Sequence, residues 1–300
     1  MTASTDSITV ENFTTLWDYS NPGATEERFR ELLPAASADQ RYHIELLTQI
    51  ARTYGLRREF HQAHTLLDEA ETLLNAYSPE ESRRPRMRYL LERGRAWNSS
   101  GKPELARPLF LDAWEIGKKG GEDRLAIDAA HMMGIIEPSE EALRWNHEAL
   151  EFTERSSDES ARLWLGSLYN NIGVTYLEAE EYDKALEYYR KGLNWHIERN
   201  SPERPMNIAR WCVARAQRSC GQVEEALAEQ RELEKLADEK GEKSGYTYEE
   251  IAECLLALNR LEEAVPYFAM AYEELTKDDY LVKNEPDRLH RLKELGEVSH

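Results

Sequence analysis

The stretch Tyr169–Trp195 reads YNNIGVTYLEAEEYDKALEYYRKGLNW, and it decides the fold. Gly173 and Tyr176 are three residues apart on one face of a predicted first helix, and a short acidic turn follows. Ala185 and Tyr189 are four residues apart on a second helix. Small residues let two helices approach closely, and the aromatic side chains fill the space that remains. Because such a pair cannot bury its apolar face alone, the pattern predicts neighbours of the same kind.

The pattern recurs along the chain. A small residue marks the first helix of six predicted pairs, at steps of 36 to 43 residues: Ala51, Gly94, Ala130, Gly173, Ala214 and Ala252. This order of small and aromatic residues resembles the tetratricopeptide repeat, whose consensus reads W-x₂-L-G-x₂-Y and then A-x₃-F with a period of about 34 residues. The longer steps resemble kinesin light chains and the bacterial intracellular peptide receptors of quorum sensing.

The resemblance implies an all-α fold, a right-handed superhelix of antiparallel helix pairs of the tetratricopeptide type, or α-solenoid. We expect six repeats over residues 42–276. Residues 1–41 are predicted to form a degenerate hairpin that caps the array, because solenoid ends need atypical units with a polar face. Residues 277–300 are predicted to form a C-terminal capping helix and tail, with Pro286 in the first helical turn.

Composition narrows the classes of function. The net charge of −19 argues against general nucleic-acid binding, which needs a basic face. No apolar run approaches the roughly 20 residues that span a bilayer, so no membrane partner is expected. Residues 1–13 lack the basic and apolar regions of a secretory signal. The three cysteines, Cys212, Cys220 and Cys254, form no CxxC pair and indicate a reduced, cytoplasmic protein.

Positions on the predicted inner face of the first helices suggest a binding site. The residue after each small residue gives a row of Arg52, Arg95, His131, Val174, Arg215 and Glu253. One turn away, the same face receives Arg88, Arg124, Asn170, Asn171, Trp211 and Arg218. Arginine holds carboxylates in a fork, and a tryptophan can anchor a partner. The sequence therefore predicts a concave, Arg-rich groove for a protein or peptide with an acidic or C-terminal carboxylate segment.

Two other interpretations stay open. The arginines can pair with acidic neighbours such as Glu92 and Asp128, in which case they only balance charge. The chain can also be a peptide-sensing regulator that acts through a partner. The carboxylate clamp of chaperone co-factors is not reproduced, because Thr48 and Arg52 stand at its first-repeat positions.

The remaining motifs predict no catalysis, cofactor or metal. His61 and His64 have a spacing that permits metal binding, but we interpret them as solvated. The basic run Arg83, Arg84, Arg86 and Arg88 is interpreted as a solvated loop, and the aromatics Tyr182, Tyr188, Tyr189 and Trp195 as packing residues. No Gly-rich phosphate loop, GxSxG or HExxH is present. Trp145, Trp164 and Leu165 either form the edge of a homodimer or seal the junction between the third and fourth hairpins.

Overall fold

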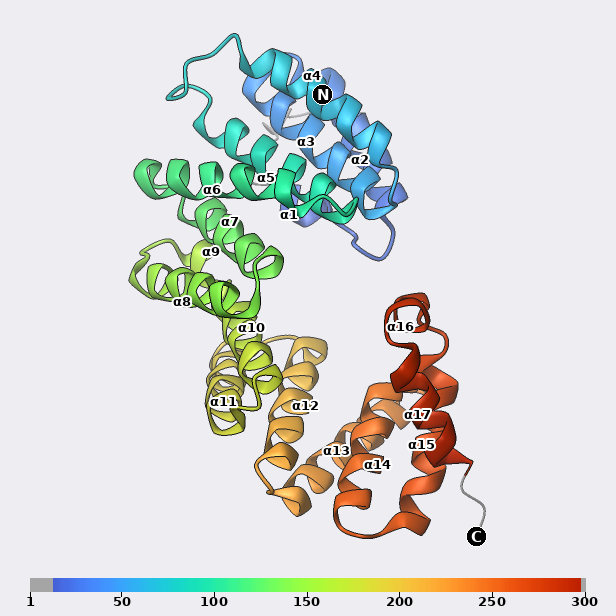
Figure 1. Cartoon of the computed structure of the whole chain (residues 1–300). Helices are drawn as coiled ribbons and strands as arrows, with labels where there is room; N and C mark the ends of the chain where they lie inside the picture. The colour runs from blue at the N-terminus through green and yellow to red at the C-terminus, as the bar shows by residue number, and fades with distance from the viewer. Residues whose placement is uncertain (1–12, 298–300) are drawn as a thin grey trace, which may run out of the picture. The chain divides into compact units, whose positions relative to one another are not determined.

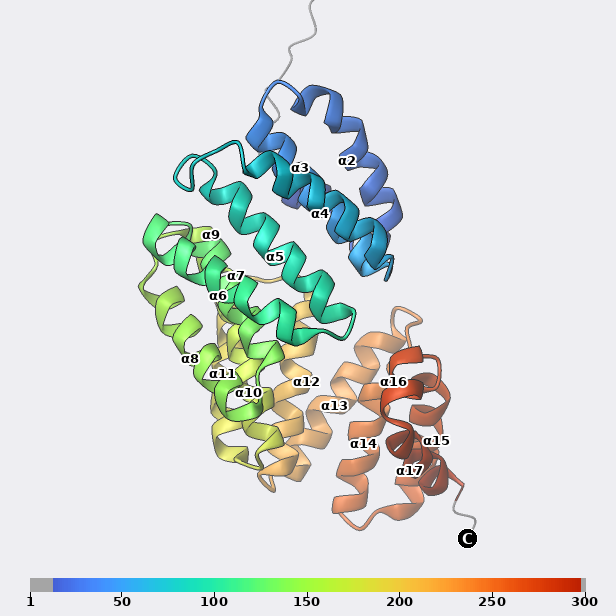
Figure 2. The ribbon, with the colours of Figure 1, turned by 45° about the horizontal axis from the view of Figure 1, so that its top comes forward.

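The computed structural model describes residues 13–297, and this part of the chain contains 17 helices and no strand. The chain divides into two compact units, Met1–Trp164 and Leu165–His300. The sequence predicts no secretory signal in residues 1–13. Residues 1–12 of this segment lie outside the described part. In both views of the ribbon, helices that follow one another in sequence pack side by side as pairs within each unit (Figures 1 and 2).

The first unit contains three helix pairs, preceded by α1 and α2, and the role of residues 1–41 as a cap stays a prediction. The described helices are α1 (Phe13–Leu16), α2 (Pro22–Ala36), α3 (Gln40–Leu56), α4 (Phe60–Leu74), α5 (Arg83–Ser99), α6 (Pro103–Gly120), α7 (Asp123–Ile136), α8 (Ser139–Arg155) and α9 (Glu159–Arg162). The pairs α3–α4, α5–α6 and α7–α8 coincide with the first three predicted repeats. Helix α2 packs on α3 through a buried cluster that includes Phe29, Leu46 and Ile50.

The second unit contains the other three pairs. Its described helices are α10 (Leu165–Glu178), α11 (Tyr182–Glu198), α12 (Glu203–Ser219), α13 (Val223–Asp238), α14 (Gly245–Ala257), α15 (Leu261–Leu275), α16 (Asp279–Asn284) and α17 (Pro286–Gly296). Helix α17 packs on α15 and contributes the buried Leu289 and Leu292 to the core. It begins at Pro286, as predicted, because the missing N–H of proline is not needed in a first turn.

Close packing inside the pairs explains the small residues of the motif. A Cβ atom on Gly94 would lie 2.5 Å from the ring of Phe110, and one on Gly173 would lie 2.5 Å from the ring of Tyr189. These distances are shorter than carbon atoms tolerate, so each glycine makes room for the aromatic residue of its partner helix. Both rings are buried, and the motif is therefore the contact surface of one hairpin.

The turn between the two helices of a pair also repeats. One residue adopts a left-handed backbone conformation in five of the six hairpins: Arg58 (φ 63°), Gly101 (φ 82°), Glu180 (φ 60°), Gly221 (φ 82°) and Asn259 (φ 57°). The third hairpin turns differently, through Glu137 and Pro138 with extended backbone. It also has Asn146 at the position where the A-x₃-F pattern that begins at Ala142 has an aromatic residue.

Candidate functional site

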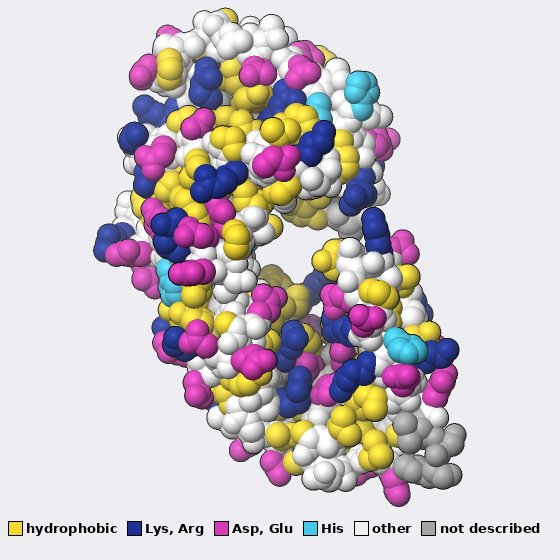
Figure 3. Space-filling view, viewed as in Figure 1, with side chains coloured by type: hydrophobic (Ala, Val, Ile, Leu, Met, Phe, Trp, Pro, Cys, Tyr) yellow, Lys and Arg dark blue, Asp and Glu magenta, His cyan; other side chains and the backbone are white. Residues whose placement is uncertain are grey.

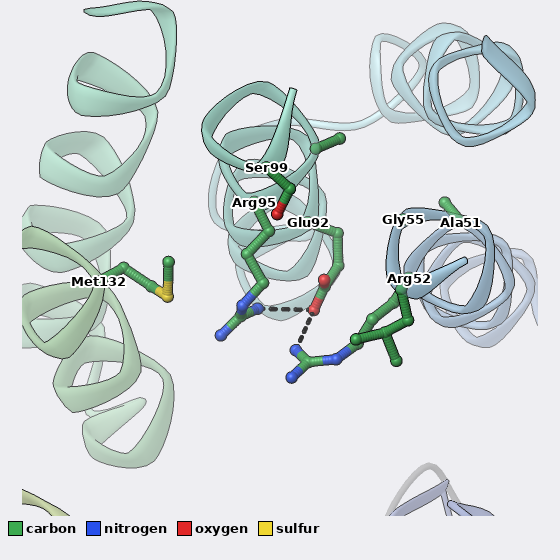
Figure 4. A pocket seen from close by; sticks show the side chains of 9 residues that line it. Ala51, Arg52, Gly55, Glu92, Arg95, Ser99 and Met132 are labelled. Carbon is green, nitrogen blue, oxygen red and sulfur yellow. Dashed lines mark hydrogen bonds and ion pairs between the residues drawn. The ribbon is translucent and has the colours of Figure 1, made fainter. Parts of the chain in front are cut away.

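The first helices of the first unit are joined by a buried ion-pair cluster. Glu92 on α5 accepts hydrogen bonds from Arg52 on α3 at 3.0 Å and from Arg95 at 2.7 Å (Figure 4). Arg95 also donates to Asp128 on α7. The structure thus brings Arg52 and Arg95 together and shows the ion pairs with Glu92 and Asp128 that the charge-balancing interpretation predicts, while a role of these arginines in ligand binding stays a prediction.

The cluster consists of two arginines and two carboxylates. Glu92 and Asp128 are only 3% and 9% exposed. Burial raises the pKa of Asp128, but the charges of Arg95 and Arg52 outweigh it, so the pKa lies below its usual value. Burial lowers the pKa of Arg95, and the carboxylates of Asp128 and Glu92 more than offset this effect. The cluster therefore has no net charge, and a ligand carboxylate must compete for its guanidinium groups.

A small pocket lies beside the cluster. Its volume is about 150 Å³, and its lining residues come from α3, α5 and α7: Ala51, Arg52, Gly55, Leu56, Glu92, Arg95, Ala96, Ser99 and Met132. Figure 4 shows Arg52 and Arg95 extending toward Glu92 from two neighbouring helices, while Met132 comes from the next helix. Pockets for drug-sized molecules or cofactors measure roughly 300–1,000 Å³. This pocket has room for one side chain, with apolar walls and charged groups at one side.

An aromatic turn adjoins the cluster, and the sequence did not point to it as part of a site. Trp17 and Tyr19 stack with ring centroids 4.9 Å apart, and the Arg52 guanidinium lies 5.7 and 5.8 Å from the two rings. The indole of Trp17 donates to Gln49 Oε1 at 3.0 Å. Tyr19 is 61% exposed. The sequence Trp17-Asp18-Tyr19 places two aromatic residues close together in the chain. That both rings lie next to Arg52 follows only from the fold.

The basic run at residues 83–88 is part of α5, so its interpretation as a solvated loop is wrong. Arg84 and Arg88 lie 3.6 and 3.5 Å from the carboxylate of Glu45, which is 3% exposed. Arg83 and Arg86 donate to backbone carbonyls at the C-terminal ends of α6 and α4. The last carbonyls of a helix lack partners within the helix and carry partial negative charge. They therefore attract the guanidinium groups of Arg83 and Arg86 and tie α5 to α6 and α4.

Arg124 and His131 stand on the same face of α7, one turn before and one turn after Asp128. Arg124 is half-buried and makes no ion pair with a residue of the described part. His131 is half-buried, and its ring lies 5.0 Å from that of Trp164. Burial, with a further contribution from Arg95, lowers the pKa of His131. Among the predicted site arginines of this unit, Arg52, Arg88 and Arg95 form ion pairs with described carboxylates, and Arg124 does not.

The second unit brings Trp211, Arg215 and Arg218 together on α12. Arg218 donates to both oxygens of Glu250 on α14, at 2.8 and 3.2 Å, whereas the nearest approach of Arg215 to this carboxylate is 3.4 Å, from Nε. The Arg215 guanidinium lies 5.4 Å from the ring of Trp211. Burial lowers the pKa of Arg218, but Glu250 raises it further, so its pKa lies above the usual value.

The other predicted positions of this unit have separate contacts. Asn170 on α10 accepts a bond from the thiol of Cys212 at 3.4 Å. The backbone carbonyl of Asn171 accepts from the Thr175 hydroxyl at 3.0 Å. Val174 is 37% exposed. The set around Arg52 and the set around Trp211 belong to different units, so a single groove through all predicted residues stays a prediction.

Several other expectations concern packing. The prediction that His64 is solvated is wrong: its Nδ1 lies 2.9 Å from Nη1 of Arg93, and the centroid of its ring lies 4.0 Å from that of Trp97, with the ring planes tilted by 38°. Within residues 13–297, no group of three or more His, Cys, Asp or Glu side chains is placed to hold a metal ion. Tyr189 packs against Gly173, and Trp195 lies against Gly166, which agrees with packing roles.

The residues considered for a homodimer edge have contacts inside their own units. Trp145 packs edge-on against Trp114, with ring centroids 6.1 Å apart, and Trp164 packs on His131. Leu165 is 5% exposed. These contacts favour a packing role, and the homodimer stays a prediction.

Charged side chains of both signs cover the surface. Figure 3 shows acidic and basic groups intermixed on the visible face, with hydrophobic side chains between them. None of the helices in the described part has the length and apolar character needed to cross a membrane.

Comparison with known proteins extends the structural findings. The family model of the tetratricopeptide repeat matches residues 166–195. No curated protein sequence matches the chain. A signal-transduction ATPase with a tetratricopeptide-repeat sensor, from Pyrococcus horikoshii, is similar in fold with a TM-score of 0.71 and 16% identity, covering 94% of this chain and 43% of that one. The chain thus spans less than half the length of that ATPase.

Two structures of the quorum sensor NprR are also similar. The apo form from B. thuringiensis has a TM-score of 0.62 and 17% identity, covering 95% of this chain and 79% of that one. NprR in complex with its cognate peptide NprX has a TM-score of 0.56 and 17% identity, covering 95% and 82%. Residues 166–195 are therefore a tetratricopeptide repeat, and the helix pairs of the chain have the fold of tetratricopeptide-repeat proteins.

Proposed function

We propose that the chain is a non-catalytic, cytoplasmic scaffold that binds a peptide segment of a partner on the inner face of its first helices. The observation that carries the proposal is the pocket beside Arg52, Glu92 and Arg95. Its volume of about 150 Å³ suits one side chain of an extended peptide, and the charged groups at its side offer hydrogen bonds to the peptide beside it. The fold-level likeness to a sensor solved with its cognate peptide supports the same class of ligand.

We further propose that the peptide contributes an acidic group. Arg124 has no ion-pair partner in the described part, and Arg52 is 24% exposed beside two aromatic rings. A ligand carboxylate that binds either of these guanidinium groups gains charge-assisted hydrogen bonds. The neutral cluster of Arg52, Glu92, Arg95 and Asp128 limits this gain, so we expect one acidic residue in the segment to matter more than a long acidic run.

The chemistry of the cysteines supports a binding role over catalysis. Burial raises the pKa of Cys212 to about 12 and that of Cys254 to about 12, so both thiols stay protonated at neutral pH. A protonated, buried thiol is a poor nucleophile. All three cysteines are free, which accords with a reducing compartment.

One observation favours a sensor as a second candidate. The ion pairs from Arg52 to Glu92 and from Arg95 to Asp128 each join two neighbouring first helices. A ligand carboxylate that takes either arginine leaves a protein carboxylate without its partner. The spacing of α3, α5 and α7 then depends on the ligand, and peptide binding is coupled to the shape of this unit.

A display library of random dodecapeptides, selected on the immobilised full-length protein, tests the binding function. We expect enrichment of peptides with one acidic residue, and at least about tenfold weaker binding of these peptides to the Arg124→Glu variant. Arg124 has no ion pair to lose, so this variant should fold normally. Arg190→Glu, a change at an exposed position of the second helix α11 where the arginine likewise makes no ion pair with a described residue, is the control for net charge. Failure to enrich any peptide would refute the proposal.

A further inference from the structure

The second unit carries an exposed aromatic and aliphatic surface on its first helices. Ile208, Trp211 and Arg215 are three and four residues apart on one face of α12, and Tyr246 adjoins them from α14. We call these four residues the α12 shelf. Ile208 is 53% exposed and Tyr246 is 40% exposed, although the neighbouring core residue Ala214 is fully buried.

Direct contacts hold the shelf together. The indole N–H of Trp211 donates to the backbone carbonyl of Tyr246 at 3.2 Å, and the two rings meet edge to face with centroids 6.2 Å apart. The guanidinium of Arg215 lies 5.4 Å from the centre of the Trp211 ring. These contacts fix a large apolar surface next to a cation. Contiguous exposed apolar surface of this kind marks interaction sites.

Arg215 keeps most of its hydrogen-bonding capacity. Arg218 holds both oxygens of Glu250, and Arg215 approaches that carboxylate most closely through Nε, at 3.4 Å, without a hydrogen bond. The two terminal nitrogens of Arg215 donate to no residue of the described part, and its side chain is 41% exposed. Two other arginines of this unit lie on α17 and form ion pairs with α14: Arg288 with Glu249, and Arg291 with Glu253. Arg215 is thus the guanidinium here that is open to an external carboxylate.

We propose that the α12 shelf binds the C-terminal residue of a peptide that ends in an apolar side chain. The free carboxylate bonds the terminal nitrogens of Arg215, and the side chain covers Trp211 and Ile208. In an extended peptide, successive side chains point to opposite sides, so an apolar residue and an adjacent acidic residue do not face one surface together. A C-terminal residue carries both groups on one α carbon. The inference rests on the proposed peptide-binding function and names its ligand for this unit.

The test uses the full-length protein and four synthetic peptides. The first is Gly-Ser-Gly-Ser-Leu with a free carboxylate, and the second is the same peptide as its amide. The third ends in Ser in place of Leu, and the fourth has an internal Leu-Asp step and a C-terminal amide. Affinity is read from titrations of the indole N–H signal of Trp211 in ¹⁵N-labelled protein, assigned with the Trp211→Phe variant.

The free acid ending in leucine should shift the Trp211 signal and bind at least about tenfold more tightly than the other three peptides. Arg215→Gln should lower its affinity to that of the amide, and the fold should persist because Arg218 still holds Glu250. Arg231→Gln, on the second helix α13 and with a side chain exposed to a similar degree (44%), should change nothing. Equal binding of acid and amide, equal binding of the internal Leu-Asp peptide, or an unshifted Trp211 signal would overturn the proposal.

These outcomes separate the α12 shelf from the general function. If a dodecapeptide library yields binders that need the pocket beside Gly55 but not Arg215, the binding function stands and the shelf proposal fails. If the library yields no binder and the leucine peptide leaves Trp211 unshifted, both fail.

Discussion

Arg52 on α3 donates a hydrogen bond to Glu92 on α5 at 3.0 Å, and this bond joins the first helices of two neighbouring repeats. The same arrangement recurs in the second unit, where Arg218 on α12 bonds Glu250 on α14. The inner-face arginines therefore have a structural role in addition to any role in binding. Their partners are buried carboxylates, whose desolvation makes the pairing necessary.

The first prediction concerns the cost of breaking this pairing. Replacement Arg95→Met should lower the free energy of unfolding by about 3–5 kcal/mol, because it leaves the buried carboxylates of Glu92 and Asp128 without their shared partner. Arg124→Met is the matched control: it removes the same type of side chain from the same face, where no ion pair exists, and should cost less than about 0.5 kcal/mol. Urea unfolding followed by circular dichroism measures both. Equal costs would show that the cluster contributes nothing.

The second prediction concerns the glycine of the repeat motif. Gly94→Ala should destabilise the protein by about 1–3 kcal/mol, because the new methyl group would lie 2.5 Å from the ring of Phe110. Gly55→Ala introduces the same group on α3, where no atom lies within 4 Å. There the higher helix propensity of alanine should raise stability by up to about 1 kcal/mol. Opposite signs in thermal unfolding are expected, and a loss of stability in both variants would contradict the packing argument.

The third prediction concerns pH. Burial and the charge of Arg93 lower the pKa of His64 from its usual value of 6.5, so the folded protein favours the neutral ring. Below pH 6.5 the unfolded chain takes up this proton more readily, and stability should fall as the pH drops from 7.5 toward 5. His131 has the same sign, because burial also lowers its pKa. The variant His64→Gln keeps an acceptor for Arg93 and should show a shallower pH dependence in denaturant titrations. An unchanged slope would exclude His64 as a contributor.

Much of the fold follows from local patterns in the sequence. Gly173 and Tyr189 are 16 residues apart, as are Gly94 and Phe110, and the structure shows that each pair is the contact between two helices of a hairpin. The sequence pattern predicts this contact because two closely packed helices need a small residue opposite an aromatic ring. Pro286 likewise marks the start of α17 through its own chemistry.

The candidate site was less predictable, because its contacts join residues that are far apart in sequence. The row of arginines was identified from its spacing, but their partners follow from helix orientation: Arg52 meets Glu92 forty residues later. The interpretation of the basic run at 83–88 as a loop is wrong, because its partners are far away in sequence: Glu45 and the end of α4 lie in the preceding repeat, and the end of α6 lies in the second helix of the same pair. The role of Tyr19 beside Arg52 was missed for the same reason.

Filling the pocket tests the central claim most directly. Gly55 lines the pocket, and a side chain added there meets no atom within 4 Å of its Cβ position. Gly55→Leu should therefore occupy the space proposed for a peptide side chain while α3 stays folded. Gly55→Ala is the matched control, with the same backbone change and a smaller group.

The decisive measurement is the affinity of library-selected dodecapeptides for these two variants and the parent protein, by fluorescence anisotropy. We expect Gly55→Leu to weaken binding at least about tenfold, the effect of displacing one buried apolar side chain, and Gly55→Ala to weaken it far less. Unchanged affinity in the Gly55→Leu variant, with its helical circular-dichroism spectrum intact, would contradict the assignment of this pocket as the peptide site.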